Sequence, residues 1–450
     1  MTDRKWYDSA SFYHIYPLGY CGALERQKES ESSHRLGLIT KRLDYIKNLG
    51  FNAIYLGPVF ESDYHGYETV DYFRVDRRLG DNDDLKTLVE KAHERGIRVV
   101  LDGVFNHAGR GLFAFQKLLE AGSDSEYIDW FSNVDFHANN HHGDGFSYGT
   151  WENHEELVKL NLENEEVKNY LLEAVSFWKD EFDIDGIRLD AADCLDMGFV
   201  KSLRAHTDTF EKDFWLMGEI IHGDYRKWLG DDRFHSVTNY EVHKGLYSSF
   251  NDSNFYEIAY SLNRQFGEGG LYRDYTLYNF LDNHDVSRIT SRLQRGAHLY
   301  PLHLLLFTIP GNPSIYYGSE WAIEGKRNET SDEMVRPFFD LDTLRDHSDH
   351  KSLFDLIQKL NWFYMQYDAL KYGGYEQILV DHEQLAFRRH LKEHDAIIAV
   401  NSSGGEKTVH LKAGNEGRYY DVLNDERYNT TDGGLAVKLF PNWGAILVAD

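Results

Sequence analysis

The chain has 450 residues, of which 42% are hydrophobic and 15% aromatic, enough to bury the cores of more than one domain. Its formal net charge of -26 disfavours nucleic acid and anionic membranes as partners, because phosphate groups are bound by clusters of Lys and Arg. The two cysteines, Cys21 and Cys194, offer neither a disulfide framework nor the ligand spacing of a zinc site.

The first eight residues are mostly polar and contain no apolar core of the kind found in a signal peptide. No uninterrupted apolar stretch of the sequence is long enough to span a bilayer. We therefore expect a cytoplasmic protein.

Eight short apolar runs predict buried β-strands, and segments with helical spacing separate most of them. In one such segment Leu85, Leu88 and Ala92 share a helix face, and Asp83 or Asp84 is the expected N-cap. The alternation predicts an α/β fold, a (β/α)8 TIM barrel. An open doubly wound sheet is disfavoured because no Gly-rich phosphate turn follows the first run. The eight runs are residues 12–16, 52–56, 97–101, 186–189, 214–217, 236–239, 276–281 and 314–317.

Two parts of the chain depart from this alternation. Residues 108–160 are rich in Gly, His, Asn and Asp, which predicts an inserted domain B that divides the barrel into residues 1–107 and 161–372. The histidines between 137 and 145 form either a polar loop wall or a metal site. Short alternating runs between turn clusters predict a C-terminal antiparallel β-sandwich over residues 373–450.

Three carboxylates follow predicted barrel strands, namely Asp190, Glu219 and Asp285. The carboxyl ends of parallel strands meet at one rim of a barrel, so we expect the three side chains to share a pocket. Carboxylates that lie close together cannot all ionise without mutual cost, so their pKa values should separate. Such a separation suits a nucleophile, a general acid and a charge-stabilising group.

Neighbouring residues indicate which carboxylate has which role. Arg188 lies two residues before Asp190, on the same side of the strand, and would keep Asp190 ionised as a nucleophile. Glu219 follows the apolar residues 215–218 and has no cation nearby in sequence, so desolvation should raise its pKa, as a general acid needs. Each residue alone would also suit a helix cap or an ion pair, and the ordered set favours catalysis.

Four segments resemble the signatures of the α-amylase family of retaining glycoside hydrolases. In that family the positions of Asp190, Glu219 and Asp285 are the nucleophile, the acid/base and the third essential carboxylate. The resemblance implies retention through a covalent glycosyl–Asp190 intermediate, with the two working carboxyl groups about 5–5.5 Å apart. The segments are residues 102–107 (DGVFNH), 186–190 (GIRLD), 218–219 (GE) and 280–285 (FLDNHD).

The resemblance also assigns residues to the sugar. Tyr67 would stack on the ring at the cleavage subsite, and Asp332 and Arg336 keep the spacing of a pair that contacts the next sugar. The other expected substrate-binding residues include two histidines that would donate hydrogen bonds to hydroxyls, and they are Asp102, His107, Arg188 and His284.

Asn106 matches a position that binds structural Ca2+ in many members of this family. The alternative is that its side-chain amide braces domain B. No cofactor is expected to be required for the reaction itself.

Residues 159–164 (KLNLEN) resemble a signature of cyclomaltodextrinases, neopullulanases and maltogenic amylases. Those enzymes usually carry an additional N-terminal domain, whereas here the predicted barrel begins almost at once. Ile221 stands where many of them have Trp, which affects stacking on the acceptor side. Asp193 and Cys194 replace the Lys-His pair of typical endo-α-amylases.

The resemblance implies a retaining hydrolase of α-1,4-glucosidic bonds in short α-glucans such as maltodextrins or cyclodextrins. The alternative enzyme class is a 4-α-glucanotransferase or isomerase, because only the access of water in the second half-reaction differs. A carbohydrate-binding protein that kept the fold is disfavoured, since all three carboxylates are present. The expected partner is an α-glucan oligosaccharide, and the sequence does not predict the oligomeric state.

Overall fold

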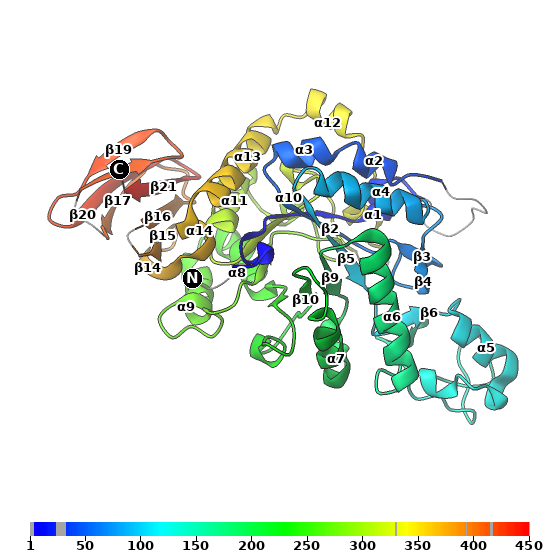
Figure 1. The fold of residues 1–450 in the computed structure, drawn as a ribbon. Helices are drawn as coiled ribbons and strands as arrows, with labels where there is room; N and C mark the ends of the chain where they lie inside the picture. Colours follow the sequence, from blue (N-terminus) through cyan, green and yellow to red (C-terminus); the bar gives the residue numbers. More distant parts are fainter. Residues whose placement is uncertain (1–3, 24–32, 329–330, 393, 415–416, 450) are drawn as a thin grey trace.

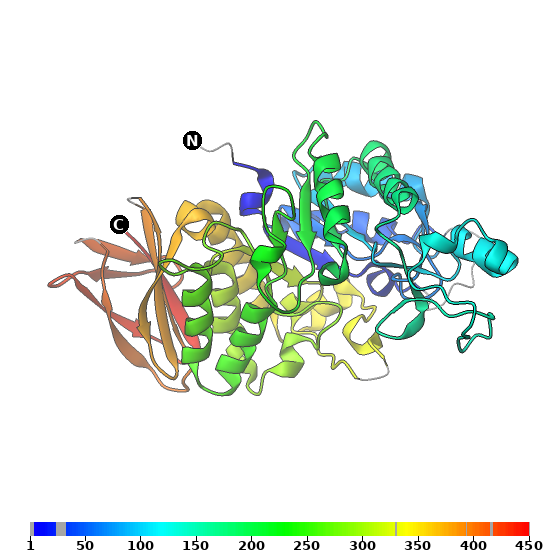
Figure 2. The ribbon, with the colours of Figure 1, turned by 90° about the horizontal axis from the view of Figure 1, so that it is seen from below.

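The computed structural model describes residues 4–23, 33–328, 331–392, 394–414 and 417–449. A barrel lies in the middle of the molecule, between a small lobe around helix α5 (Phe113–Ala121) and a pair of C-terminal sheets (Figure 1). The second view shows the same order, with the lobe and the C-terminal sheets at opposite ends (Figure 2). Among the described helices, none is both long and apolar enough to cross a membrane.

The predicted parallel barrel is confirmed. Its strands form one sheet in the order β11-β10-β9-β5-β2-β1-β13-β12, and each strand pairs with its neighbours in parallel. A parallel bridge between Thr238 and Tyr278 joins the two outer strands, so the sheet closes on itself. Each predicted run overlaps one strand, and the strands are β1 Phe12–Ile15, β2 Ala53–Leu56, β5 Arg98–Gly103, β9 Gly186–Leu189, β10 Trp215–Gly218, β11 Ser236–Val237, β12 Tyr278–Phe280 and β13 Asn312–Tyr316.

Large side chains fill the interior of the barrel. Phe12 and Trp215 stack with their ring centroids 4.9 Å apart, and Tyr278 packs edge-on against Phe12. The barrel is therefore a packed core rather than a pore, as in other barrels of this type. The rigid strands hold the residues at their carboxyl ends in fixed positions.

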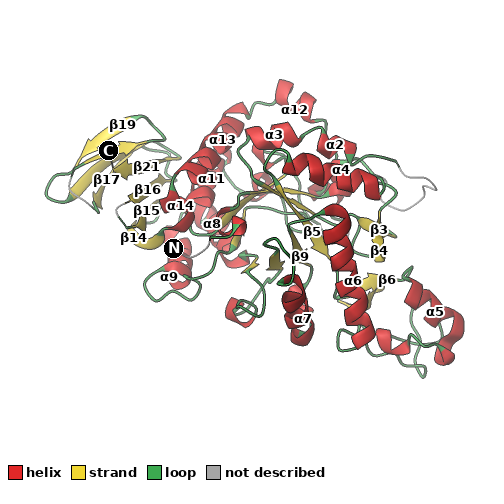
Figure 3. Ribbon diagram, viewed as in Figure 1, coloured by secondary structure: helices red, strands yellow, loops and turns green. Residues whose placement is uncertain are grey.

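Helices surround the strands (Figure 3). Helix α4 buries Leu85, Leu88 and Ala92 as expected, but its N-cap is Asp81 and not Asp83 or Asp84. The helix begins earlier because Asp81 and Asp84 cap each other's backbone N–H groups. The described α-helices outside the lobe are α1 Pro17–Tyr20, α2 Gly37–Thr40, α3 Leu43–Asn48, α4 Asn82–His93, α6 Glu165–Phe182, α7 Met197–Thr207, α8 Tyr240–Asn251, α9 Phe255–Phe266, α10 Ile289–Arg292, α11 Leu299–Thr308, α12 Leu341–His347, α13 Lys351–Gln366 and α14 Asp368–Tyr372.

The lobe lies within the residues predicted as domain B. Its sheet has the order β6-β8-β7, with strands β6 His107–Gly109, β8 His154–Lys159 and β7 Thr150–Trp151. A hairpin of strands β3 (Phe60–Ser62) and β4 (Thr69–Val75) approaches β6 from the barrel side. These strands belong to sheets that are separate from the barrel sheet.

The C-terminal strands form a six-stranded antiparallel sheet, β14-β15-β16-β21-β18-β19, and a two-stranded sheet, β17-β20. Apolar side chains of both sheets, including Ile397 and Val437, form one cluster between them, as a sandwich requires. Strand β19 was not predicted, because its residues alternate only between half-buried and exposed. The strands are β14 Gly374–Val380, β15 Gln384–Leu391, β16 His394–Asn401, β17 Lys407–Lys412, β18 Arg418–Asp421, β19 Glu426–Asn429, β20 Gly434–Leu439 and β21 Trp443–Ala449.

Candidate active site

A cavity of about 1950 Å³ opens at the carboxyl ends of the barrel strands. Residues that follow β1, β9, β10 and β11 line it, and these are Tyr16, Asp190, Glu219 and Tyr240. Domain B contributes Trp151 to the wall. The cavity thus lies where barrel enzymes carry their chemistry.

Asp190, Glu219 and Asp285 all line this cavity, as predicted from their places at strand ends. The first two are nearly buried, at 8% and 7% exposure. Ala191, directly after Asp190, has a left-handed backbone with φ of +43°, and its N–H donates to Glu219 Oε2 over 3.3 Å. This turn brings the ends of β9 and β10 together.

Arg188 is shared among three carboxylates. Its Nη1 lies 2.9 Å from Asp190 Oδ1 and 2.8 Å from Asp102 Oδ1, and its Nη2 lies 2.6 Å from Glu219 Oε2. Glu219 has no cation nearby in sequence, but in the folded chain Arg188 forms an ion pair with it. Adjacent parallel strands place Arg188 of β9 beside the residue that follows β10, which sequence distance does not reveal.

The pKa values of the carboxyls separate, but Asp190 does not shift in the direction expected. Burial raises the pKa of Asp190 well above its usual range, and the charges of Glu219 and Asp102 add to the rise while Arg188 opposes it. Burial also acts to raise the pKa of Asp285. However, the neighbouring His284 and Arg336 hold the pKa of that carboxyl well below its usual range. Asp285 is consequently the carboxylate that stays ionised most firmly.

Tyr67 is positioned by a tight turn. Gly66 has φ of +98°, and a Cβ there would lie 2.8 Å from the side chain of Pro58. The Tyr67 hydroxyl lies 3.1 Å from Asp102 Oδ2 and is also hydrogen-bonded to His284 Nε2. Its ring lines the cavity and is parallel to the His284 ring within 7°.

Three of the predicted substrate-binding residues lie behind the cavity wall. Asp102, Arg188 and His284 are each at most 2% exposed and are not among the lining residues. Asp102 accepts hydrogen bonds from Tyr55 and Tyr67 as well as from Arg188. In this structure the three therefore hold the lining residues in place and do not themselves face the cavity.

His107 lines the cavity and presents a free ring nitrogen. Its Nδ1 lies 3.2 Å from Nδ2 of Asn106, so it accepts a hydrogen bond from that amide and the ring proton is on Nε2. Nε2 has no hydrogen-bond partner and lies 3.8 Å from Asp190 Oδ2. Burial lowers the pKa of His107 to about 3, so the imidazole is neutral.

Asp332 and Arg336 form the predicted pair at the wall of the cavity. Arg336 Nη2 lies 3.0 Å from Asp332 Oδ2 and 2.9 Å from Asp285 Oδ1. Its guanidinium also sits 4.8 Å from the ring centroid of Tyr16. Arg336 therefore ties the third carboxylate to the part of the cavity walled by Tyr16.

The calcium site expected at Asn106 stays a prediction. Its Oδ1 is buried without a hydrogen-bond partner, and its backbone oxygen accepts from Leu160 of domain B. Calcium requires six to eight oxygen ligands, and no cluster of acidic side chains joins Asn106 in the described ranges.

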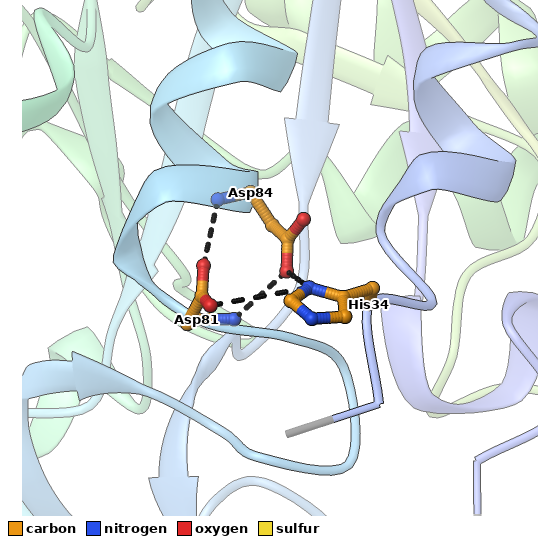
Figure 4. A group of neighbouring side chains, drawn as sticks. All are labelled: His34, Asp81 and Asp84. Atoms are coloured by element: carbon orange, nitrogen blue, oxygen red, sulfur yellow. Dashed lines mark hydrogen bonds and ion pairs between the residues drawn. The ribbon is translucent and has the colours of Figure 1, made fainter.

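One cluster with the composition of a metal site occurs among the described residues, formed by His34, Asp81 and Asp84 (Figure 4). Its contacts serve helix α4, because Asp81 and Asp84 form the capping box and His34 Nδ1 bonds to Asp84 Oδ2 over 2.6 Å. In domain B, His141 Nδ1 lies 2.8 Å from Glu155. In the described part of the chain, the histidines of domain B belong to no cluster with the composition of a metal site. This favours the prediction that they form a polar loop wall.

Several lining residues were not predicted. Tyr240 lies three residues after the end of β11 and hydrogen-bonds Glu219, and Tyr16 directly follows β1. Their position after a barrel strand was the available signal. Trp151 of domain B, whose ring centroid lies 5.8 Å from that of His107, carries no comparable signal in sequence.

A barrel whose strand ends bring two working carboxylates and a third acidic group into one cavity defines a class of glycoside hydrolases. Residues 28–359 match the family model described as "Alpha amylase, catalytic domain", and the chain belongs to this family. The resemblance noted in the sequence is thereby confirmed.

Relatives in this family carry names that agree with the subfamily signature. The intracellular maltogenic amylase of Bacillus subtilis is 33% identical over 342 residues, which are 72% of this chain and 57% of that protein. The cyclomaltodextrinase of Geobacillus thermopakistaniensis is 33% identical over 419 residues, or 91% and 69% of the two chains. The solved structure of a cyclic α-maltosyl-(1→6)-maltose hydrolase from Arthrobacter globiformis has a TM-score of 0.83 at 26% identity, covering 99% of this chain and 100% of that one.

Proposed function

We propose that the chain is a retaining hydrolase of α-1,4-glucosidic bonds in short α-glucans, such as maltodextrins and cyclodextrins. The observation that carries the proposal is the meeting of Asp190, Glu219 and Asp285 at the wall of one cavity, with Arg188 bonded to the first two. Membership of the α-amylase family and the names of the relatives support it.

In the first half-reaction the ionised form of Asp190, which the charge of Arg188 favours against the effect of burial, attacks the anomeric carbon while the bond from that carbon to the glycosidic oxygen breaks. Glu219 gives its proton to the departing oxygen, so the leaving sugar departs with a neutral hydroxyl. One negative charge thereby moves from Asp190, now an ester, to Glu219. Because Arg188 contacts both side chains, its guanidinium remains paired with a carboxylate throughout this transfer.

In the second half-reaction water attacks the anomeric carbon, Glu219 accepts the proton of that water, and Asp190 leaves as a carboxylate. Two displacements at one carbon retain the α configuration. Positive charge develops on the sugar in both transition states. The ionised Asp285 places negative charge at the wall of the same cavity, which stabilises these states.

A 4-α-glucanotransferase would use the same first half-reaction and replace water by the hydroxyl of a second sugar. The two functions differ in their products, since transfer yields glucans longer than the substrate. A cytoplasmic location also stays a prediction, in keeping with the name of the Bacillus subtilis relative.

The test is a time course of products from maltoheptaose and β-cyclodextrin, with Asp190→Asn as the matched control. We expect shorter α-configured products from the wild type and a loss of about 10³-fold or more in turnover for the variant. A fluorinated maltosyl fluoride should trap a covalent adduct on Asp190, detected by peptide mass spectrometry. No cleavage of either glucan would refute hydrolysis, and early products longer than the substrate would replace it by transfer.

A further inference from the structure

We propose that Tyr240, held by Asn283, is a positioning residue that orients Glu219 for proton transfer to the leaving sugar. The inference rests on the proposed function. Tyr240 is the first residue of helix α8 and lies three residues after the end of β11, the barrel strand next to the one that precedes Glu219. Its hydroxyl donates to Glu219 Oε1 over 3.0 Å.

The two oxygens of Glu219 have different surroundings. Oε2 receives the charged Nη2 of Arg188 at 2.6 Å and the backbone N–H of Ala191 at 3.3 Å. Among the described residues, the hydrogen bond that Oε1 receives comes from the neutral hydroxyl of Tyr240. Two donors already point at Oε2, so the proton that Glu219 gives away is carried by Oε1, beside Tyr240.

Tyr240 is itself fixed in direction. Asn283 Nδ2 donates to the Tyr240 oxygen over 3.1 Å, which uses an acceptor site of the hydroxyl and leaves its O–H free to point at Glu219. The Tyr240 ring packs edge-on against Phe280, with centroids 4.9 Å apart. Burial, together with the charges of Glu219 and Asp285, raises the pKa of Tyr240 well above its usual range, so the hydroxyl stays protonated.

Asn283 also shapes the turn that carries Asp285. Its Oδ1 accepts the backbone N–H groups of Asp285 and Val286 at 2.8 and 3.1 Å. One amide therefore holds Asp285 with its oxygen and Glu219, through Tyr240, with its nitrogen. A rigid link of this kind keeps two carboxyl groups from different strands in a constant relation.

The link matters most when Glu219 becomes ionised. As its proton passes from Oε1 to the glycosidic oxygen, the Tyr240 O–H remains to donate to the new negative charge. Without the hydroxyl, ionised Glu219 loses this donor and Oε1 loses its orientation. The rate should therefore fall for substrates whose leaving group must be protonated. It should stay nearly unchanged for substrates whose leaving group departs without a proton.

The experiment compares Tyr240→Phe with Tyr260→Phe, a matched control on helix α9 that is 69% exposed and does not line the cavity. For Tyr240→Phe we expect kcat on maltotetraose to fall about 10- to 100-fold. With α-maltosyl fluoride, which needs little acid assistance, the loss should stay below about 3-fold. The basic limb of kcat/KM on maltotetraose should move to higher pH, and the control should match the wild type in each respect.

Equal losses on the two substrates, or no loss on maltotetraose, would overturn the inference, and so would an unmoved basic limb. Turnover of the fluoride by the same preparation shows that the variant is folded. Absence of wild-type turnover on both substrates would count against the proposed function. Normal wild-type turnover with an unaffected Tyr240→Phe variant would count against the role of Tyr240 alone.

Discussion

Arg336 touches both acidic residues of the predicted sugar-binding side of the cavity, Asp285 and Asp332. Its replacement by Met keeps most of the side-chain length and removes the cation. Because a nearby cation favours the ionised carboxyl, its removal raises the pKa of Asp285. We expect the acidic limb of kcat/KM on maltotetraose to move to higher pH, with a loss of about 10-fold at neutral pH.

The measurement is the pH profile of kcat/KM for Arg336→Met and for Arg345→Met, an exposed arginine on helix α12 that does not line the cavity. The control should leave both limbs unchanged. A profile of Arg336→Met that keeps its shape and only drops in height would show that Arg336 does not act through the charge of Asp285.

Residue positions near strand ends were predictable from the sequence, whereas their partners were not. Asp190 and Glu219 each follow a recognisable apolar run, so their meeting at one rim follows from the barrel. The contact between Arg188 and Glu219 depends on the register between neighbouring strands, β9 and β10. Tyr240 was not predicted, because its contribution to the site is a hydrogen bond to Glu219, a residue from a different strand end and distant in sequence.

At the scale of single elements, the start of helix α4 shows how a local contact overrides a local pattern. Asp81 and Asp84 cap each other, and His34 bonds to Asp84 from a distant segment (Figure 4). Replacing Asp81 by Ala removes the acceptor for the Asp84 N–H. We expect the free energy of unfolding to fall by about 1 kcal/mol, because that is the usual cost of losing an N-cap side chain.

Urea unfolding followed by tryptophan fluorescence measures this change. The matched control is Asp81→Asn, which keeps a capping oxygen and should stay within a few tenths of a kcal/mol of the wild type. Neither variant should alter turnover, since none of the three residues of the cluster lines the cavity. Equal destabilisation by Ala and Asn would mean that the charge of Asp81, and not its cap, stabilises the helix.

Elements with a clear apolar period were predicted and those without one were not. The barrel strands are buried on both faces and therefore appear as continuous apolar runs. Strand β19 lies at the edge of the C-terminal sheet and pairs only with β18 within that sheet. Its sequence, Glu-Arg-Tyr-Asn, carries no apolar alternation because neither of its faces is fully buried.

At the scale of the whole molecule, a buried arginine joins the barrel to the C-terminal sandwich. Arg389 of β15 donates to the backbone oxygen of Thr308, at the end of helix α11, over 2.7 Å. It also donates to the oxygen of Gly373, the residue before β14. Burial lowers the pKa of Arg389 to about 10, and no carboxylate of the described residues pairs with its charge. The sandwich is therefore anchored to the barrel by carbonyl groups at the junction.

Buried histidines contribute to the response of the whole fold to acid. Burial lowers the pKa of His235 and His243 to about 3 and that of His303 to about 4, whereas an unfolded histidine has a pKa near 6.5. Between these values the unfolded chain binds protons that the folded chain does not. Stability is therefore present at neutral pH and is lost as the pH falls below about 6.5.

His303 offers a direct test of this account. It lies inside helix α11 with Nδ1 bonded to the oxygen of Leu299, while Nε2 is buried without a partner. In His303→Leu the unfolded chain has one fewer proton to bind. We expect the drop in unfolding free energy between pH 7 and pH 5 to be smaller than in the wild type by about 2 kcal/mol. Urea unfolding at the two pH values measures this difference, with the exposed His410→Ala as control. An identical drop in His303→Leu and the wild type would show that His303 binds its proton equally well in the folded and unfolded states.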